Sequence, residues 1–347
     1  MLNHIKHTIQ SGAPLKEALK KLNEVPQNLS LFVLNADQQL IGTLTDGDIR
    51  RGLLNGLPVE SIVDKFMFKD FHAIHGIPDP REIQKLRKLG IKLIPVLDDN
   101  LRIVQILDLK IIKSYLPIDA VIMAGGRGER LRPLTDTVPK PMLPLGGKPI
   151  VEHNIERLKE YGIKNIHISI NYLGQQLKDH FGNGHSRGLN VKYVAEDKPL
   201  GTIGSISLIE EFENPYILVM NSDLFTDVDL EDMWLSIEEQ EADLCVASIP
   251  YTVNIPFAIM ERSNGCITGL KEKPSNTHFA NAGIYIFRRE VLNLIPNNQP
   301  FNATDLIEEV IKEKGKVIDT PITGYWIDIG RHEEYEKAKM IVQHVQR

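Results

Sequence analysis

The sequence predicts a two-domain protein, in which an α/β domain with a mostly parallel sheet follows a smaller domain of two α+β repeats. The chain has 347 residues, more than one ordinary hydrophobic core organises. Its first 115 residues contain an internal repeat, whereas the remainder alternates strand-like and helix-like segments. The boundary is expected near Leu116 and Pro117, so that the two domains span residues 1–116 and 117–347.

The internal repeat aligns LSLFVLNADQQLIGTLTDGDIRRGL with IKLIPVLDDNLRIVQILDLKIIK. Each copy has an apolar strand-like run, a turn rich in Asn and Asp, a second strand and the start of a helix. Helical stretches with apolar residues three and four positions apart, APLKEALKKLNE and PREIQKLRKLG, precede the two copies. Two β-α-β-β-α-like units are therefore predicted, and short repeats of this kind usually pack face to face.

The second part of the chain begins with DAVIMAGG, an apolar strand that ends in glycines. PIVEHNIERLKEYG follows as an amphipathic helix, and further strands are expected at NIHISIN, NVKYVAE, YILVMNSD and ADLCVASIP. RHEEYEKAKMIVQHVQ is expected to be a final helix. Strands that alternate with helices predict a mostly parallel sheet covered on both faces.

The composition argues against several classes of protein. A net charge of −6 gives no general basic surface for nucleic acid. No apolar run approaches the roughly 20 residues that span a bilayer, and the N-terminal stretch lacks a signal-peptide core. Cys245 and Cys266 lack metal-type spacing. We therefore expect a cytoplasmic protein without a nucleic-acid or membrane partner.

The stretch Ala124–Met142 has the composition of a loop that binds phosphate groups. Three glycines, whose N–H groups can approach an anion closely, follow a strand, and three arginines and a lysine lie in the same stretch. A Walker A loop is excluded because no Gly-Lys-Ser/Thr follows the glycines, and a dinucleotide fingerprint is disfavoured because Leu131 occupies the place of its third glycine. The number of cations indicates a triphosphate.

These residues also carry a family resemblance. GGRGERLRPLTDTVPKPMLPLGGKPI strongly resembles the signature of the sugar-1-phosphate nucleotidyltransferases, and PLGTIGS, NSD, KEKP, NAGIYIF and WIDIG follow in the order expected for that family. The resemblance covers most of residues 118–347. It implies a Rossmann-like domain in which a sugar-1-phosphate oxygen attacks the α-phosphate of a nucleoside triphosphate and pyrophosphate leaves.

The resemblance implies roles for individual residues. Arg130 and Lys140 correspond to the cations on the α-phosphate and the departing pyrophosphate, and Asp223 and Asp328 to the ligands of a shared Mg²⁺ ion. Taken singly, either aspartate fits a turn or a cap equally well. The implied nucleotide contacts are Ala124, Gly125, Gly126, Gly128, Glu196 and Gly201, and the implied sugar-phosphate contacts are Glu272, Lys273, Asn281 and Gly283, with Lys273 also catalytic.

The base and the sugar are narrower hypotheses. Glu196 lies where the family recognises the base, and a carboxylate can accept both the N1–H and the N2–H₂ of guanine, so GTP is expected. The order of domains resembles glucosamine-1-phosphate guanylyltransferases of bacterial legionaminic acid pathways. Mannose-1-phosphate guanylyltransferases and pyrophosphorylases that use UTP or dTTP are the alternatives.

The N-terminal repeats resemble a pair of CBS domains, a module that typically senses adenine nucleotides. In GTLTDGDIRR, Thr45 and Asp48 match the ribose-binding pattern, whereas the second copy has Leu107 and Lys110 at these positions. A module for packing and dimerisation that binds no ligand is the alternative. Because CBS pairs often dimerise, a homo-oligomer is expected.

The competing hypothesis from another class is a non-catalytic, nucleotide-sensing subunit. Such a subunit would be expected to lack a metal carboxylate or the cations of the loop. Arg130, Lys140, Asp223, Lys273 and Asp328 are all present, which favours an enzyme.

Overall fold

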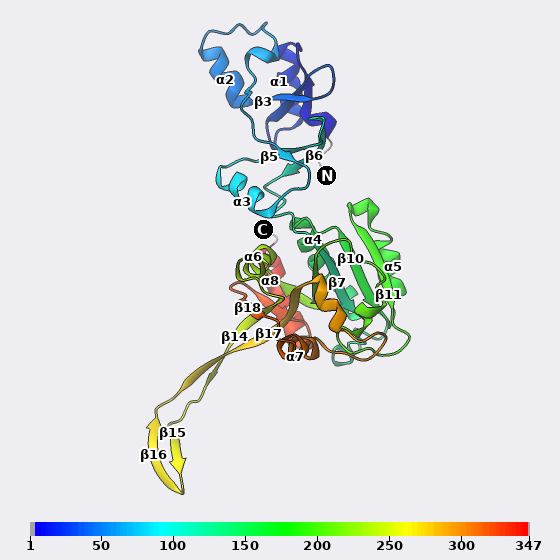
Figure 1. The fold of residues 1–347 in the computed structure, drawn as a ribbon, viewed down its shortest axis with the longest axis vertical. Helices are drawn as coiled ribbons and strands as arrows, with labels where there is room; N and C mark the ends of the chain where they lie inside the picture. The colour runs from blue at the N-terminus through cyan, green and yellow to red at the C-terminus, as the bar shows by residue number, and fades with distance from the viewer. Residues whose placement is uncertain (1–3, 346–347) are drawn as a thin grey trace. The chain divides into compact units, whose positions relative to one another are not determined.

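The computed structural model describes residues 4–345 and divides between Tyr115 and Leu116 into two compact units, drawn as a ribbon in Figure 1. Residues 1–3 and 346–347, with which the two expected domains begin and end, lie outside the described residues. None of the helices within residues 4–345 combines the length and the apolar character needed to cross a membrane.

The first unit contains two small sheets of three strands each. The first repeat comprises β1 (Thr8–Gln10), α1 (Leu15–Glu24), β2 (Ser30–Leu34), β3 (Leu40–Thr45) and α2 (Asp46–Leu54). The second comprises β4 (Ile74–His75), α3 (Pro80–Lys88), β5 (Leu93–Leu97) and β6 (Ile103–Asp108). In each sheet the first strand is parallel to the second, and the second is antiparallel to the third. The repeat is therefore present in the fold.

The two repeats share part of their core. One cluster of buried side chains draws Phe32, Leu34 and Leu40 from the first repeat and Leu93, Leu97 and Ile106 from the second. A hydrogen bond of 3.1 Å from Asn28 Nδ2 to Asp108 Oδ2 also joins them. Leu40 N donates to Leu101 O at 2.9 Å. The repeats thus pack as one unit.

The helix expected at the end of the second repeat is absent. Residues 109–111 form a single turn, in which Asp108 accepts hydrogen bonds from the backbone N–H groups of Lys110, Ile111 and Ile112. The next strand begins at Ile118, directly after Pro117. Too few residues remain for a helix, and the proline disfavours helical backbone in the residue before it.

The second unit contains a seven-stranded sheet in the order β11-β10-β7-β12-β17-β14-β18. Its strands are β7 (Ile118–Ala124), β10 (Asn165–Ile170), β11 (Asn190–Ala195), β12 (Tyr216–Asn221), β14 (Leu244–Asn254), β17 (Ser275–Arg288) and β18 (Val317–Pro321). The first four strands in the order are mutually parallel, and β17 is antiparallel to β12 and β14. The predicted α/β fold with a mostly parallel sheet is confirmed.

Helices cover both faces of this sheet, as expected. Its helices are α4 (Ile150–Glu160), α5 (Gln175–Phe181), α6 (Leu230–Gln240), α7 (Ala303–Lys312) and α8 (His332–Val345). Side chains of β7 alternate between two cores, because Ala120 and Ile122 pack with residues of α4, α5 and α6, whereas Val121 packs with residues of α7. The short strands β13 (Leu224–Thr226) and β19 (Trp326–Asp328) pair beside the sheet.

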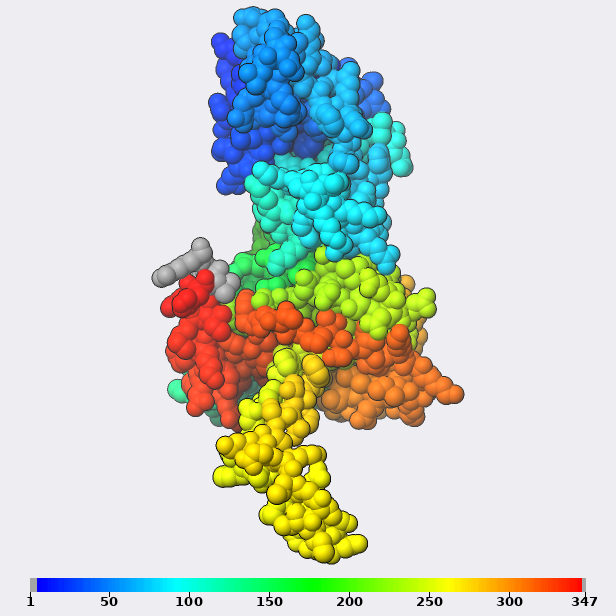
Figure 2. Space-filling model, turned by 90° about the vertical axis from the view of Figure 1, so that its left-hand side faces the viewer, coloured from blue at the N-terminus to red at the C-terminus, as the bar shows by residue number. Residues whose placement is uncertain are grey.

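A long β-ribbon, which the sequence analysis did not predict, extends from the sheet. β14 and β17 continue to pair beyond the sheet, from Ile249 and Ala280 to Asn254 and Ser275. The ribbon then forms a hairpin of β15 (Ile259–Ser263) and β16 (Cys266–Lys271). We call residues 249–280 the arm; it is the yellow segment that projects from the body of the second unit in Figures 1 and 2.

Candidate active site

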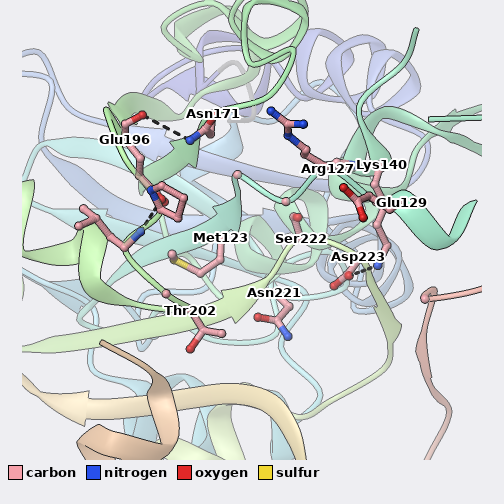
Figure 3. Close-up of a pocket in the computed structure, with 18 of the residues that line it drawn as sticks. Met123, Arg127, Glu129, Lys140, Asn171, Glu196, Thr202, Asn221, Ser222 and Asp223 are labelled. Carbon is pink, nitrogen blue, oxygen red and sulfur yellow. Dashed lines mark hydrogen bonds and ion pairs between the residues drawn. The ribbon is translucent and has the colours of Figure 1, made fainter. Parts of the chain in front are cut away.

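A cavity of about 810 Å³ opens at the carboxyl ends of the parallel strands of the second unit. Its walls come from the loop after β7, from Asn171 after β10, from Glu196 after β11 and from Ser222 and Asp223 after β12. Figure 3 shows these side chains around the opening. This edge is where open α/β sheets bind their ligands, because loops from several strands meet there.

The glycine loop forms one wall of the cavity, and its glycines serve different purposes. Gly128 has a φ of +64°, and a Cβ there would lie 3.0 Å from the Cβ of Lys140, so the fold itself requires this glycine. Gly126 has an ordinary φ, and a Cβ there would meet no protein atom within 4 Å. The open space at Gly126 faces the cavity, which suits the close approach of an anion to the backbone.

Three of the four cations of the loop lie around the same cavity. Arg127, Arg130 and Lys140 line it. The guanidinium of Arg127 lies over the ring of Tyr172, at 5.6 Å from the ring centroid. Arg132 does not line the cavity; its Nε forms an exposed ion pair of 3.2 Å with Asp136 Oδ1.

Lys140 and Asp223 form an ion pair at the base of the cavity (Figure 3). Both side chains are largely buried, and the ammonium contacts Asp223 Oδ2. The other oxygen, Asp223 Oδ1, is buried without a hydrogen-bond partner. A carboxylate oxygen in that condition is costly unless a ligand completes it, so it points to a cation or a donor that the site is built to receive.

Asp328 lies next to Asp223 because their segments are paired. Leu224 of β13 is opposite Asp328 of β19, and Ile329 N donates to Asp223 O at 3.1 Å. Asp328 is exposed, yet partial desolvation of its carboxylate raises its pKa, and the neighbouring Asp223 raises it further. The positive charges of Lys140 and Arg130 lower the pKa of Asp328. Two adjacent carboxylates of this kind favour a shared cation.

The donor set fits a divalent ion that is also bound by substrate. Within residues 4–345 no three His, Cys, Asp or Glu side chains gather into a metal-binding group. Mg²⁺ commonly uses one or two carboxylates and completes its shell with phosphate oxygens and water. Asp223 and Asp328 would supply the protein ligands, and the unpaired Asp223 Oδ1 supports this assignment.

Glu196 lines the opposite end of the cavity, and its carboxylate is held by neighbours. Its Oε1 accepts from Ser169 Oγ at 2.7 Å, and its Oε2 accepts from Leu200 N at 3.4 Å. Each oxygen keeps a further lone pair. Gly201 has a φ of +76° and a Cβ there would lie 2.7 Å from Phe301 O, so packing alone accounts for that glycine.

Most predicted nucleotide and metal residues come together, whereas the predicted sugar residues do not. Ala124 is the buried last residue of β7, directly before the glycines. Asn281 and Gly283 lie in β17 outside the cavity lining, although a Cβ on Gly283 would meet Asn221 Nδ2 at 2.7 Å. Glu272 and Lys273 are exposed on the arm and do not line the cavity.

The cavity also contains residues that sequence reasoning missed. Glu129, Asn171, Thr202, Asn221 and Ser222 all line it. Asn171 and Asn221 could have been found, because each stands at the end of a parallel strand. Glu334, at the start of α8, contributes to raising the pKa of Asp328 and has a buried Oε2 without a hydrogen-bond partner. No pattern in the sequence identifies it.

A second cavity, of about 470 Å³, lies between the repeats of the first unit. Thr45, Gly47 and Arg50 line it from the first repeat, and Gly90 and Lys92 from the second.

The predicted ligand residues of the first repeat are engaged in capping α2. Thr45 is the N-cap, Asp48 N donates to Thr45 Oγ1 at 3.2 Å, and Asp48 Oδ2 accepts from Thr45 N at 2.8 Å. Asp48 also pairs with Arg51 and does not line the cavity. In the second repeat Leu107 is fully buried, and Lys110 Nζ donates to Gln27 O at 2.9 Å.

Two family models match separate parts of the chain. Residues 119–345 match the family model described as nucleotidyl transferase, and residues 5–55 match that of the CBS domain. The match to the CBS model covers the first repeat.

Among curated proteins, the chain is 33% identical over 221 residues to a bifunctional protein GlmU of Methanocaldococcus jannaschii. It is 31% identical over 234 residues to a mannose-1-phosphate guanylyltransferase of Mycobacterium tuberculosis, and 30% identical over 241 residues to a UTP–glucose-1-phosphate uridylyltransferase of Synechocystis. These matches cover 62%, 64% and 63% of the chain, and 52%, 63% and 62% of the relatives' own lengths.

Among solved structures, a glucose-1-phosphate thymidylyltransferase from Bacillus anthracis, described as putative, matches with a TM-score of 0.54 and 26% identity. The match covers 65% of this chain and 95% of that one. HddC from Yersinia pseudotuberculosis matches with a TM-score of 0.51 and 26% identity, over 65% of this chain and 99% of that one.

Proposed function

Because the chain belongs to the nucleotidyl transferase family, we propose that it is an enzyme that transfers a nucleotidyl group from a nucleoside triphosphate to a sugar 1-phosphate. The observation that supports this most strongly is the Lys140–Asp223 pair, which leaves Asp223 Oδ1 unpaired at the base of the 810 Å³ cavity beside the glycine loop. A cation, two carboxylates and open backbone N–H groups are what the transfer of a charged phosphoryl-type group needs.

In the proposed reaction, a phosphate oxygen of the sugar 1-phosphate forms a bond to the α-phosphorus of the triphosphate. The bond between that phosphorus and the oxygen bridging to the β-phosphate breaks, and pyrophosphate leaves with the electron pair. The glycine loop and Arg130 would orient the triphosphate. Lys140, whose ammonium has three donors, would contact Asp223 and the phosphates together. No general base is needed, because the attacking phosphate is already an anion.

We propose Mg²⁺ as the cation held by Asp223 and Asp328. When bound, it would neutralise charge on the phosphate oxygens. The contribution of the protein residues is to hold the two carboxylates side by side through the pairing of β13 with β19.

For the substrates we propose GTP and glucosamine 1-phosphate. The base proposal is supported by Glu196, which lines the cavity and whose two oxygens each accept one hydrogen bond and retain a lone pair for a guanine edge. The sugar proposal rests on the order of the two domains alone. Mannose 1-phosphate with GTP, and glucose 1-phosphate with UTP or dTTP, are the alternatives.

The test is a pyrophosphate-release assay of the full chain with Mg²⁺. The four ribonucleoside triphosphates and dTTP are crossed with glucosamine, N-acetylglucosamine, mannose and glucose 1-phosphates. We expect release above background with GTP and glucosamine 1-phosphate, at the highest kcat/KM of the panel. A preference for UTP or dTTP would contradict the base proposal alone, whereas release with no pair from a folded protein would contradict the enzymatic proposal.

For the first unit we propose binding of an adenine nucleotide in the cavity between the repeats. The cations of Arg50 and Lys92 and the start of α2 support it, since a helix N-terminus with nearby cations suits phosphate. Calorimetric titration of the full chain with AMP and ATP tests this, with Arg50→Gln as the weakened variant. AMP heat that is identical in Arg50→Gln, or no heat with either nucleotide, contradicts the proposal.

A further inference from the structure

Two buried serine side chains connect the carboxylate of Glu196 to the interior of the second unit. Ser205 Oγ donates to Ser169 Oγ at 3.0 Å, and Ser169 Oγ donates to Glu196 Oε1 at 2.7 Å. Ser169 and Ser205 are 0% and 1% exposed, whereas Glu196 lines the cavity beside Asn171 (Figure 3). This hydrogen-bonded chain therefore begins in the core and ends at a group that a bound ligand can reach.

The chemistry of the groups fixes the direction of this chain. An ionised carboxylate only accepts hydrogen bonds, so the hydroxyl of Ser169 must donate to Glu196. A serine hydroxyl has one hydrogen, so Ser169 Oγ can then only accept from Ser205. A bond to a charged acceptor is strong, and a second hydroxyl that donates to the first strengthens it by polarisation. The chain therefore holds Glu196 Oε1 in one place as an acceptor.

The two oxygens of Glu196 are held unequally. Oε1 accepts from Ser169 at 2.7 Å, whereas the contact of Oε2 with Leu200 N is 3.4 Å long. The first distance is near the optimum for its kind, and the second is longer than usual and weak. The torsion that turns a glutamate carboxylate has broad minima. Without the bond from Ser169, the orientation of the carboxylate would therefore be poorly fixed.

The positions of the two serines do not call for hydroxyl groups. Serine side chains commonly bond to the backbone of their own turn or helix end. Ser169 instead bonds to side chains 27 and 36 residues away, although it stands between the buried residues Ile168 and Ile170 of β10. Ser205 is buried in the 3₁₀ helix Gly204–Leu208. Alanine would fill either position without the cost of burying a hydroxyl, so the carboxylate that they hold explains these serines better than packing does.

We propose that Ser169 and Ser205 are positioning residues for nucleotide selection, which hold Glu196 so that its two oxygens accept from the N1–H and N2–H₂ of guanine together. A carboxylate of fixed orientation can accept from both donors, whereas one that rotates satisfies the pair only part of the time. Neither serine lines the cavity, so both act through Glu196. The inference rests on the proposed binding of GTP and explains how this chain selects it.

Inosine triphosphate is the probe that isolates this effect. It differs from GTP only in lacking the amino group N2, so the two nucleotides share their phosphates, their ribose and the N1–H group. The ratio of their dissociation constants therefore measures the second hydrogen bond to Glu196. We expect the wild type to bind GTP at least about tenfold more tightly than inosine triphosphate, as the loss of a bond to a charged group implies.

The test is calorimetric titration of the full chain with GTP and with inosine triphosphate, each with Mg²⁺ and without a sugar phosphate. In Ser169→Ala the ratio is expected to fall below about threefold, because the carboxylate loses its anchor. In Ser205→Ala it is expected to fall less, since the direct bond from Ser169 to Glu196 remains.

Two further variants show whether the effect passes through Glu196. Ser248→Ala is the matched control, because Ser248 is another buried strand serine whose Oγ donates to a carboxylate, Asp319 Oδ2, at 2.6 Å, and neither residue lines the cavity. It should keep the wild-type ratio. Glu196→Gln retains one acceptor and should lower the ratio. Adding Ser169→Ala to Glu196→Gln should lower it no further, since both changes remove the same interaction.

A double variant separates this effect from a loss of stability. Ser169→Ala leaves the hydroxyl of Ser205 without its acceptor, which costs stability. Ser169→Ala with Ser205→Ala removes both hydroxyls, and replacing both partners by apolar groups is close to neutral. The double variant should therefore unfold near the wild-type temperature, followed by circular dichroism, and still show the low ratio.

The proposal is overturned if the wild type binds both nucleotides equally or binds neither, or if the double variant is folded and keeps the wild-type ratio. An equal fall of the ratio in Ser248→Ala would also overturn it, because the effect would then follow from the loss of any buried hydroxyl. Binding is measured without turnover. Selective GTP binding that depends on Ser169, in a chain that releases no pyrophosphate with any sugar phosphate, would therefore support this inference and contradict the proposed transferase activity alone.

Discussion

At the scale of single residues, the decisive feature of the site is a carboxylate that is only half satisfied. Asp223 uses one oxygen to pair with Lys140 and keeps the other buried and unpartnered. A buried carboxylate oxygen without a hydrogen-bond partner lowers the stability of the folded protein. Asp223 is therefore expected to contribute far more to catalysis than to the stability of the fold.

We therefore predict that Asp223→Asn lowers kcat by at least about 10²-fold, the magnitude typical of lost electrostatic stabilisation. The amide preserves the shape and a hydrogen-bonding group but removes the charge that holds a cation. Pyrophosphate release measures the loss of kcat, and calorimetric titration with Mg²⁺ measures the loss of cation binding. Asp136→Asn, which alters an exposed carboxylate outside the cavity lining, is the control and should keep full activity.

Asp328 gives a prediction about pH. Its pKa is raised, first by partial desolvation and then by Asp223, so it takes up a proton at a higher pH than an ordinary aspartate. Metal affinity is expected to weaken on acidification while the pH is still above about 3.9, the usual aspartate value. Affinity for Mg²⁺ measured across a pH series checks this; a midpoint at or below the ordinary value contradicts it.

The raised pKa of Asp328 also means that its ionised carboxylate destabilises the folded protein when no metal is bound. A carboxyl with a raised pKa in the folded state stabilises the fold below its unfolded-state pKa, and this contribution is lost as the pH rises through the folded value. In metal-free protein at neutral pH, Asp328→Asn should therefore increase the free energy of unfolding, by no more than about 1 kcal/mol for an exposed group. Added Mg²⁺ should stabilise the wild type but not this variant.

The glycines of the loop provide a paired prediction. Gly128→Ala should lower the free energy of unfolding by about 1–2 kcal/mol, because alanine is strained at a φ of +64° and would crowd Lys140. Gly126→Ala should leave stability within about 0.5 kcal/mol and raise the KM for the triphosphate, because the new methyl occupies open space at the cavity. Chemical denaturation and steady-state kinetics on both variants separate the two roles. Equal losses of stability in Gly128→Ala and Gly126→Ala would contradict the prediction that the two glycines have different roles.

At the scale of elements, the start of α2 shows that a pattern resembling a ligand site has a structural role in the fold. The Thr45–Asp48 pattern that resembles a ribose site forms a capping box in the structure. We predict that Thr45→Ala lowers the free energy of unfolding of the first unit by about 1 kcal/mol without any nucleotide present. Thermal denaturation measures the loss, with Thr45→Ser, which keeps the capping oxygen, as the control. Unchanged stability in Thr45→Ala would indicate that the hydroxyl has no structural role.

The elements built from local patterns were largely predictable from the sequence. Amphipathic spacing identified α1, α3 and α4, and apolar runs identified the strands whose ends carry Asp223 and Glu196. The glycine loop was recognisable because its composition is unusual. These features depend on short stretches of chain, which sequence patterns describe well.

Features that depend on distant segments were not predictable. The position of Glu334 beside Asp328 depends on where α8 packs. The arm was missed because its strands alternate weakly and its turn, Asn264-Gly265, marks a hairpin without indicating that it leaves the body. The placement of Glu272 and Lys273 on that arm, away from the cavity, follows from the same omission.

At the scale of the whole molecule, each of the two units has its own core. Buried clusters in the described residues belong either to residues before Leu116 or to residues from Leu116 onward. We predict two transitions in calorimetric unfolding of the full chain. GTP with Mg²⁺ should raise the midpoint of the transition of the second unit, by RT ln(1 + [L]/Kd) in free energy, and leave the other unchanged.

The Asp223→Asn variant is the control, because it should lose the shift with GTP and Mg²⁺ while keeping both transitions. A single cooperative transition that moves as a whole would mean that the two units unfold together.

The strand order of the large sheet also affects how the chain is synthesised. β12 is central in the sheet, yet its neighbour β17 follows it only after α6, β14 and the whole arm. At translation rates of about 5–20 residues per second, the ribosome needs on the order of 3–13 s to produce the intervening chain. During that interval one edge of β12 has no strand to pair with, whereas the N-terminal repeats have already emerged with all their partners. The second unit therefore exposes an unpaired strand edge during synthesis for longer than the first unit does.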